Sequence, residues 1–388
     1  MQRRPNCTRQ WKVTRADCFG ALPKLDSDSV DSVITDPPYG IGVNGMEWDR
    51  PARLDPSTPT GKRRRRPANE NPNRAFQTFS REWSSACLHS LKPGGHLAAF
   101  AAPRTAHRLA SGLEEAGFEL RDVLMWLQGQ GYPATRVLPS GLGTGLKPAW
   151  EPIILARKPL DGTLDQNLRA HGTGAMNIDA TRIALSTQDY PTEGRARGRR
   201  ITASQRGRWP ANLLLSHGSS CGACCEPECP IALLGDHHRF FYAAKAPRRE
   251  RDAGCEELPR RVVQTFKIGA RNEEMCEANP VANIHPTVKP IELMRWLVRL
   301  LTPQGGLVLD PFTGSGSTGA AAVLEGARFF GIEREASYVP IARARITYWS
   351  RQARGAGATK PKAARRRGAT HTPRAKAANG LETFDRSR

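Results

Sequence analysis

The segment Val308–Gly319, VLDPFTGSGSTG, places a glycine-rich turn between a short apolar strand and a helix. The spacing of Gly314, Gly316 and Gly319 matches G-x-G-x-x-G, a pattern with which strand–turn–helix units bind the phosphates of dinucleotides. In open α/β sheets such ligands bind beyond the carboxyl ends of the strands. The segment therefore predicts an α/β fold with a cofactor site at this turn.

Two acids near the turn distinguish between cofactors. Glu333 closes the next expected strand, 23 positions after Asp310, where an acid reaches the ribose hydroxyls of an adenosine cofactor. A dinucleotide fingerprint runs from the strand directly into glycine, but here Asp-Pro-Phe-Thr intervenes, so the Asp310 carboxylate would lie close to the pyrophosphate. A cofactor with an ammonium and a sulfonium suits Asp310 better. We expect S-adenosylmethionine, and an NAD-dependent oxidoreductase is the alternative.

Strand and helix patterns alternate on both sides of this turn. In the run that ends at Ile34, we expect Val30, Val33 and Ile34 to be buried and Asp28 and Asp31 to face out. The alternation predicts a doubly wound, mostly parallel sheet. Strands are expected at 11–13, 30–34, 96–100, 119–127, 307–309 and 328–332, with helices at 18–25, 76–91, 104–116, 290–301, 319–325 and 338–350.

The alternation stops in residues 129–280, which are rich in Gly, Pro and Arg and have strand-like pieces at 150–156, 209–215 and 240–244. We interpret this segment as an inserted region of irregular structure. It separates one half of the main domain, residues 1–128, from the other, residues 281–350. Within the first half, residues 50–75 are predicted to form a mobile basic loop. Residues 351–388, with eleven Lys and Arg against two acids, are predicted to form a disordered basic tail.

The charge of the chain is strongly positive: 58 Lys and Arg against 37 Asp and Glu give a net charge of +21. Such a field attracts polyanions, so nucleic acid is the favoured partner over a membrane surface or an acidic protein. No apolar run approaches the roughly 18 residues that a membrane span needs. The N-terminal segment lacks the apolar core of a signal peptide, so a cytoplasmic location is expected.

Four motifs follow one another along the chain: TDPPYG (35–40), HPTVKPIELM (285–294), DPFTGSGSTG (310–319) and FFGIERE (329–335). In this order they resemble those of the DNA amino-methyltransferases, the N6-adenine and N4-cytosine DNA methylase family. Because the catalytic motif precedes the cofactor motif, the chain is similar to the beta group. The segments LKPAWEPIILARKPL, HGTGAMNIDATRI and GRWPANLLLSH resemble those of phage- and prophage-type methylases.

This resemblance implies a Rossmann-like, S-adenosylmethionine-dependent methyltransferase fold with permuted motif order. It implies site-specific methylation of a flipped-out base in double-stranded DNA, as in restriction–modification systems, with residues 129–280 as the target-recognition region. A homodimer is compatible with the sequence. The residues implied in cofactor binding are Asp310, Phe312, Thr313, Gly314 and Gly316 under the methionine part, Glu333 at the ribose, His285, Thr287 and Lys289 in the segment that meets the methionine carboxylate, and Asp17 at the adenine amine, a solvated Asp17 being the alternative.

TDPPYG holds the residues implied in catalysis: Asp36, Pro37, Pro38 and Tyr39. Two consecutive prolines fix φ and donate no hydrogen bond, so this strand exit is rigid. The exocyclic amine of a nucleobase is a poor nucleophile because its lone pair is delocalised into the ring. If Asp36 and the carbonyl of Pro37 each accept one N–H, the nitrogen becomes pyramidal and can attack the sulfonium methyl.

The target base must be flipped out of the duplex, and Tyr39 offers a ring on which it can stack. Trp126 is the candidate for the opposite face, and a core tryptophan is the alternative. Aspartate in the first position of the motif resembles the adenine-specific members, so we expect N6-adenine, with N4-cytosine as the alternative. A C5-cytosine methylase is disfavoured because it needs a nucleophilic Cys after proline, and Cys229-Pro230 has the reverse order. Methylation of RNA or protein and non-catalytic DNA binding are more distant alternatives.

A cluster of cysteines lies within the inserted region. Thiolates and an imidazole at such spacing can bind one tetrahedral zinc ion, which would brace the region. The alternative is a reduced, Cys-rich loop packed against Leu213–Leu215. The candidate ligands are His217, Cys221, Cys224, Cys225 and Cys229.

Overall fold

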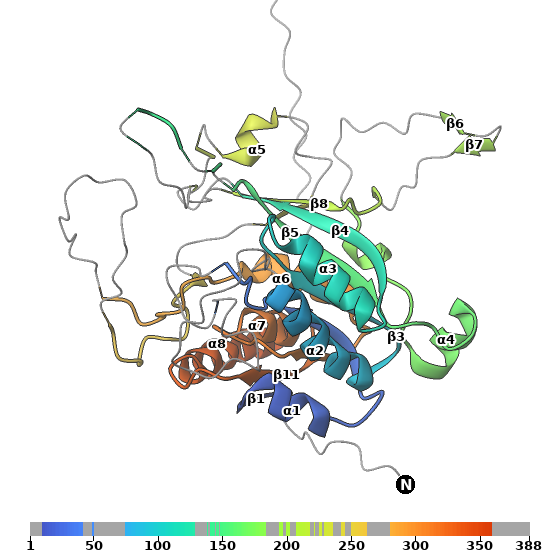
Figure 1. Ribbon diagram of the computed structural model, residues 1–388, viewed down its shortest axis with the longest axis horizontal. Helices are drawn as coiled ribbons and strands as arrows, with labels where there is room; N and C mark the ends of the chain where they lie inside the picture. The colour runs from blue at the N-terminus through green and yellow to red at the C-terminus, as the bar shows by residue number, and fades with distance from the viewer. Residues whose placement is uncertain are drawn as a thin grey trace, which may run out of the picture.

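The computed structural model in Figure 1 describes the chain between residues 10 and 358 with several gaps. Cys224, most of the predicted loop 50–75 and the segment 359–388 lie outside the described residues. The described residues are 10–41, 49, 74–128, 138, 140–143, 145–146, 148–183, 194–196, 199–201, 207–217, 221, 225–226, 229–235, 242–244, 250–261 and 280–358.

Nine of the described strands form one sheet, in the order β1-β11-β10-β2-β3-β5-β4-β8-β9. Within this sheet β5 alone runs antiparallel to its neighbours, which confirms the predicted α/β class with a mostly parallel sheet. The strands are β1 (Trp11–Arg15), β2 (Val30–Thr35), β3 (Leu91–Phe100), β4 (Glu119–Leu127), β5 (Trp150–Arg157), β8 (Leu213–Ser216), β9 (Tyr242–Ala244), β10 (Leu307–Asp310) and β11 (Arg328–Glu333).

Helices cover both faces of this sheet (Figure 1). One face packs against α6 (Ile291–Leu301), α7 (Ser317–Leu324) and α8 (Val339–Ala358), and the other against α2 (Arg74–Ser90) and α3 (Ala106–Glu115). In β2, Ile34 belongs to the first core and Val33 to the second, because successive side chains of a strand point to opposite faces. The short elements are α1 (Cys18–Ala21), η1 (Leu22–Lys24), α4 (Leu164–His171), η5 (Asp179–Thr181), α5 (Pro230–Leu233), and the separate strand pair β6 (Gly194–Ala196) and β7 (Arg199–Ile201).

Asp31 departs from the expected pattern of β2. Asp28 is exposed as predicted, but Asp31 is only 4% exposed. One carboxylate oxygen of Asp31 accepts the backbone N–H of Leu307, and the other forms an ion pair with Lys92. Asp31 is buried because β2 is an interior strand, and its charge is tolerated because both oxygens have partners.

The segment 129–280 contributes three strands to the main sheet. β5 lies between β3 and β4, while β8 and β9 extend the sheet beyond β4. The run Ile153–Ala156 in β5 is buried throughout, as expected for a strand covered on both faces. The later residues 250–261 pack against the second half of the domain, where Arg251 donates to the carbonyl oxygens of Asn283 and His285.

The C-terminal helix is longer than the sequence patterns indicate. α8 continues to Ala358, so residues 351–358, which we assigned to the disordered tail, are helical. Arg, Gln and Ala in this stretch are good helix formers and extend a helix already anchored on the core. None of the helices in the described part of the chain combines the length and the apolar character needed to cross a bilayer.

Candidate active site

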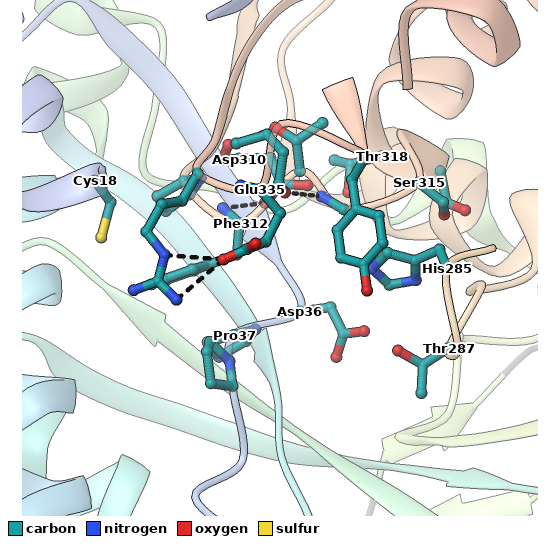
Figure 2. A pocket seen from close by; sticks show the side chains of 18 of the residues that line it. Cys18, Asp36, Pro37, His285, Thr287, Asp310, Phe312, Ser315, Thr318 and Glu335 are labelled. Carbon is teal, nitrogen blue, oxygen red and sulfur yellow. Dashed lines mark hydrogen bonds and ion pairs between the residues drawn. The ribbon is translucent and has the colours of Figure 1, made fainter. Parts of the chain in front are cut away.

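A cavity of about 1100 Å³, including its open mouth, lies at the carboxyl ends of β2, β10 and β11. Figure 2 shows the side chains of Asp36, His285 and Thr287 gathered beside the turn that follows β10. Parallel strands that end at the same edge of the sheet bring these distant segments together. Of the predicted site residues, the cavity lining includes Asp17, Asp36, Pro37, Pro38, Tyr39, His285, Thr287, Lys289, Asp310, Phe312, Thr313, Gly314 and Glu333.

The exit of β2 is held by hydrogen bonds among side chains. The Tyr39 hydroxyl lies 2.7 Å from Asp36 Oδ1 and 3.0 Å from Glu151 Oε2. Burial and these two carboxylates raise the pKa of Tyr39 well above its usual value, so the phenol stays protonated. The Tyr39 hydroxyl can therefore donate to Asp36, which fixes the position of that carboxylate at the end of the strand.

Lys289 is the cation of this group. Its ammonium lies 2.6 Å from Asp36 Oδ2 and 3.4 Å from Glu151 Oε2. Burial by itself would lower the pKa of Lys289, but Asp36 and Glu151 outweigh it and raise that pKa. We expected Lys289 at a methionine carboxylate, whereas the structure places it on Asp36, and its contact with a cofactor stays a prediction.

The turn after β10 is arranged around Asp310. Asp310 Oδ1 accepts the hydroxyl of Thr35 at 2.7 Å and the N–H of Phe312 at 3.1 Å. Burial raises the pKa of Asp310 to about 7, although hydrogen bonds from neutral donors, which include the Thr318 hydroxyl, act in the opposite direction. A cation that enters the cavity would therefore bind the ionised form of Asp310.

The glycines of the turn have two different tasks. A Cβ at Gly314 would lie 2.6 Å from His285 Nε2, so only glycine lets the turn lie against this histidine. Gly316 caps α7 with φ +79, and a Cβ there would lie 2.9 Å from the Cα of Ala342. Gly316 is not among the residues that line the cavity, so in this structure it serves helix packing rather than ligand contact.

Glu333 and Asp17 lie at the β1–β11 side of the cavity. Glu333 accepts the N–H groups of Gly314 and Glu335 at 2.7 Å each, and burial raises its pKa. Arg15 pairs with Glu333 in the sheet, so Asp17, just beyond β1, reaches the same edge. Asp17 caps α1 by accepting the N–H of Phe19 at 2.9 Å, and its side chain is half exposed.

His285 is buried and neutral. Burial and the nearby Lys289 lower the pKa of His285 to about 3. Its ring meets the Tyr338 ring edge-on with centroids 4.6 Å apart. Nδ1 of His285 is buried and makes no hydrogen bond of good geometry among the described residues, while the Thr287 backbone lies close enough to raise the pKa of the ring slightly.

The prediction for Trp126 is not supported. Trp126 is 5% exposed, its ring packs edge-on against Phe100, and Nε1 donates to Ser216 Oγ at 2.8 Å. It belongs to the apolar core and does not line the cavity. The reason is that successive side chains of β4 point to opposite faces: Trp126 lies with Leu124 on the face that packs on the core, whereas Met125 is exposed.

Two acids of the site were missed by the sequence analysis. Glu151 contacts Tyr39 and Lys289 from β5, and the only indication was a lone acid before the apolar run Ile153–Ala156. Asp49 is fully buried and accepts the N–H groups of Tyr39 and Gly40, which braces the turn after the prolines. No local pattern distinguishes Asp49 from other polar loop residues.

The predicted metal ligands lie elsewhere. His217, Cys221, Cys225 and Cys229 come together at the end of β8, and none of them lines the cavity. The fifth candidate, Cys224, lies outside the described residues.

An α/β sheet with a D-P-P-Y strand exit beside an acidic glycine turn defines an amino-methylase type of site. The sequence profile of the DNA methylase family N6_N4_Mtase matches residues 30–344, and the protein belongs to this family. The resemblance inferred from the motifs is thereby confirmed.

Relatives of this chain include two bacterial type II methyltransferases. M.HindIII from Haemophilus influenzae is 24% identical over 369 residues, which cover 86% of this chain and 94% of the relative. M2.DpnII from Streptococcus pneumoniae is 46% identical over 65 residues, 17% of this chain and 24% of the relative. A solved structure, the PvuII DNA methyltransferase described as cytosine-N4-specific, is 15% identical with a TM-score of 0.49, covering 89% of this chain and 93% of that one.

Proposed function

We propose that this protein transfers a methyl group from S-adenosylmethionine to the N6 amine of an adenine flipped out of double-stranded DNA. The observation that supports this most is the position of the Asp36 carboxylate, fixed by Tyr39 and Lys289, on the cavity that also contains the Asp310 turn. A methyl acceptor at Asp36 and a methyl donor at Asp310 would then share one enclosed space.

The residues of the cavity fit S-adenosylmethionine. Asp310 is a buried carboxylate with a raised pKa, so it gains from a cationic ligand, and the buried carboxylate of Glu333 can accept hydrogen bonds from ribose hydroxyls. The neutral ring of His285 supplies a further polar group on the cavity lining. When bound, this cofactor supplies an electrophilic methyl group on a sulfonium.

The acceptor amine would bind at the end of β2. One N–H donates to Asp36 and the other to the carbonyl of Pro37, which frees the nitrogen lone pair for in-line attack on the methyl carbon. The N–C bond would form as the C–S bond breaks, and the amine proton would then leave to solvent or to Asp36. Lys289 and Tyr39 keep the carboxylate in place, and the prolines prevent the peptide from relaxing.

The choice of adenine rests on Asp36 as the first residue of the D-P-P-Y motif. N4-cytosine has the same type of exocyclic amine and is the second candidate. Both bases fit the amine-binding geometry, so the product must be identified chemically.

The test is methyl transfer from radiolabelled S-adenosylmethionine to duplex DNA, followed by nucleoside analysis by mass spectrometry. We expect N6-methyladenine. N4-methylcytosine as the product would overturn the choice of base. If neither methylated base were formed, the proposed function would be overturned.

The variant Asp36→Ala tests the role of the Asp36 carboxylate as acceptor of the amine N–H. It should abolish methyl transfer, because the amine loses its acceptor, while equilibrium binding of S-adenosylmethionine persists. Near-normal turnover of Asp36→Ala would remove this carboxylate from the mechanism.

A further inference from the structure

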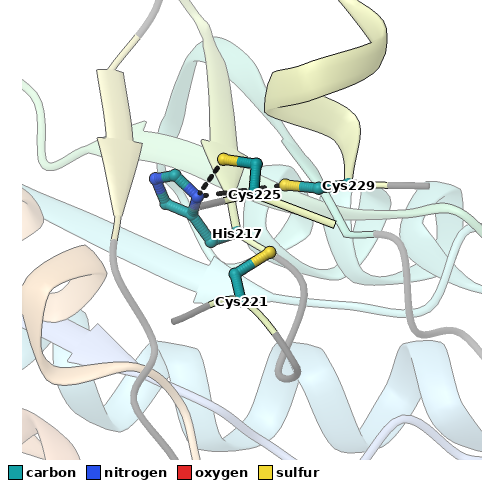
Figure 3. Close-up of side chains that lie close together, drawn as sticks. All are labelled: His217, Cys221, Cys225 and Cys229. Carbon is teal, nitrogen blue, oxygen red and sulfur yellow. Dashed lines mark hydrogen bonds between the residues drawn. The ribbon is translucent and has the colours of Figure 1, made fainter. Parts of the chain in front are cut away.

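Four side chains of types that can bind a metal converge beyond the end of β8 (Figure 3). The ligand atoms of His217, Cys221, Cys225 and Cys229 all lie within 4.8 Å of one another. His217 Nδ1 is 3.2 Å from Cys225 Sγ and 3.9 Å from Cys229 Sγ. These residues recur every fourth position, in the pattern H-x3-C-x3-C-x3-C.

This arrangement matches the coordination shell of zinc. With Zn–S bonds of about 2.3 Å and Zn–N bonds of about 2.0–2.1 Å, tetrahedral geometry separates ligand atoms by roughly 3.5–3.8 Å. The two distances from His217 Nδ1, 3.2 and 3.9 Å, lie on either side of this range, and all four ligand atoms lie within 4.8 Å of one another. Three thiolates and one imidazole favour Zn²⁺ over the hard cations Mg²⁺ and Ca²⁺, which prefer oxygen ligands.

We propose that His217, Cys221, Cys225 and Cys229 bind a structural zinc ion. All four positions of the tetrahedron are filled by protein, so the site is closed and leaves no position for a substrate. None of the four residues lines the cavity, which separates this site from the proposed methyl transfer.

The fold around the site shows what the metal stabilises. His217 directly follows β8, and Cys229 directly precedes α5. Cys229 packs with Leu215 and Ile231 in a small apolar cluster, which Cys221 joins from its edge. Such a cluster is too small to order a loop by itself, so we expect the metal to join β8 to α5.

A series of contacts also connects the proposed zinc site with the residues at the end of β2. Ser216, next to His217, accepts the indole N–H of Trp126 in β4. Trp126 pairs in register with Glu151 of β5, and Glu151 contacts Tyr39. Zinc should therefore fix the outer edge of the same sheet that positions the catalytic group.

The experiment begins with metal analysis of the purified full-length protein by mass spectrometry. We expect one zinc per chain. A mercurial reagent, which binds the thiolates, should release it. Replacement by Co²⁺ should give the intense visible bands of tetrahedral cobalt with thiolate ligands, a readout independent of methyl transfer. Absence of metal together with three freely reactive thiols would overturn the proposal, as would a disulfide among these cysteines in peptide mapping.

The matched variants are Cys225→Ser and Cys224→Ser, which replace neighbouring thiols. Cys225→Ser should lose the zinc on dialysis against a weak chelator and lower the melting temperature. Cys224→Ser should keep the metal and the cobalt spectrum. The reverse outcome would overturn the assigned ligand set. Binding of S-adenosylmethionine should persist in both variants, so a failure of the zinc proposal is distinguishable from a failure of the proposed function.

Discussion

Lys289 faces two carboxylates, Asp36 and Glu151, in a position where it is only 7% exposed. A buried charge that loses its partner is expensive, typically by about 3–5 kcal/mol. The site therefore combines Asp36, the proposed acceptor of the amine N–H, with the cation that makes its burial tolerable.

This balance predicts the effect of Lys289→Met. The variant leaves two carboxylates without their cation, so we expect the free energy of unfolding to fall by about 3–5 kcal/mol in chemical denaturation. The control is Lys289→Met combined with Glu151→Gln, which removes one of the two charges and should recover part of the loss. A single variant as stable as the wild type would show that the ion pair contributes nothing.

The raised pKa of Asp310 predicts that both the stability of the protein and its affinity for a cationic cofactor depend on pH. In the unfolded chain its carboxyl has a pKa near 3.8, but in the folded protein the pKa is about 7. The folded state thus holds a proton that the unfolded state has lost, so the contribution of Asp310 to stability is fullest below about pH 3.8 and falls as the pH rises towards 7. A cationic cofactor favours the ionised form, so its affinity should increase as the pH rises through 7.

Isothermal titration of S-adenosylmethionine across this pH range measures the effect. Asp310→Asn should bind weakly with a flat profile. The matched control is Glu250→Gln: burial also raises the pKa of Glu250 to about 7, but Glu250 does not line the cavity. If Glu250→Gln flattened the profile and Asp310→Asn did not, the assignment to Asp310 would be wrong.

At the scale of elements, the turn between β10 and α7 depends on close approach rather than on glycine flexibility alone. Gly314 has φ +51, and a Cβ there would meet His285 Nε2. Gly305 has a similar backbone, φ +70, but no atom within 4 Å of its virtual Cβ. The pair therefore separates backbone strain from steric overlap.

We expect Gly305→Ala to cost about 1–2 kcal/mol, the usual strain of a left-handed residue with a side chain. Gly314→Ala should cost a further 1–3 kcal/mol, roughly, because the histidine must move, and should also weaken S-adenosylmethionine binding. Thermal unfolding and titration measure the two effects. Equal costs for both variants would mean that His285 accommodates the methyl group.

Several elements could be predicted from local patterns, and others could not. The apolar period located β2, β10 and β11, because each is a short buried run ended by polar or glycine residues. The burial of Asp31 could not be predicted, since its partners, the N–H of Leu307 and the ammonium of Lys92, are distant in sequence. The antiparallel insertion of β5 between β3 and β4 was likewise invisible, because strand order leaves no local trace.

At the scale of the whole molecule, the net charge of +21 predicts DNA affinity that depends strongly on salt. Residues 359–388 contain nine Lys and Arg against two acids. Removing them should leave S-adenosylmethionine binding unchanged, but should weaken DNA binding and reduce the slope of log K against log salt. Fluorescence anisotropy with labelled duplex measures the slope. An unchanged slope would place the DNA contacts on other basic segments.

The sequence by itself determined the class of fold, the family and about half of the cavity lining. Those depend on short motifs whose backbone chemistry is local: the proline-fixed exit at Asp36 and the glycine turn after Asp310. Only the tertiary structure decided which charges meet. It placed Lys289 and Glu151 on Tyr39, buried Trp126 in the core, and brought His217 to three cysteines. The physical reason is that such pairings depend on strand order and register, which are set by the burial of the whole chain.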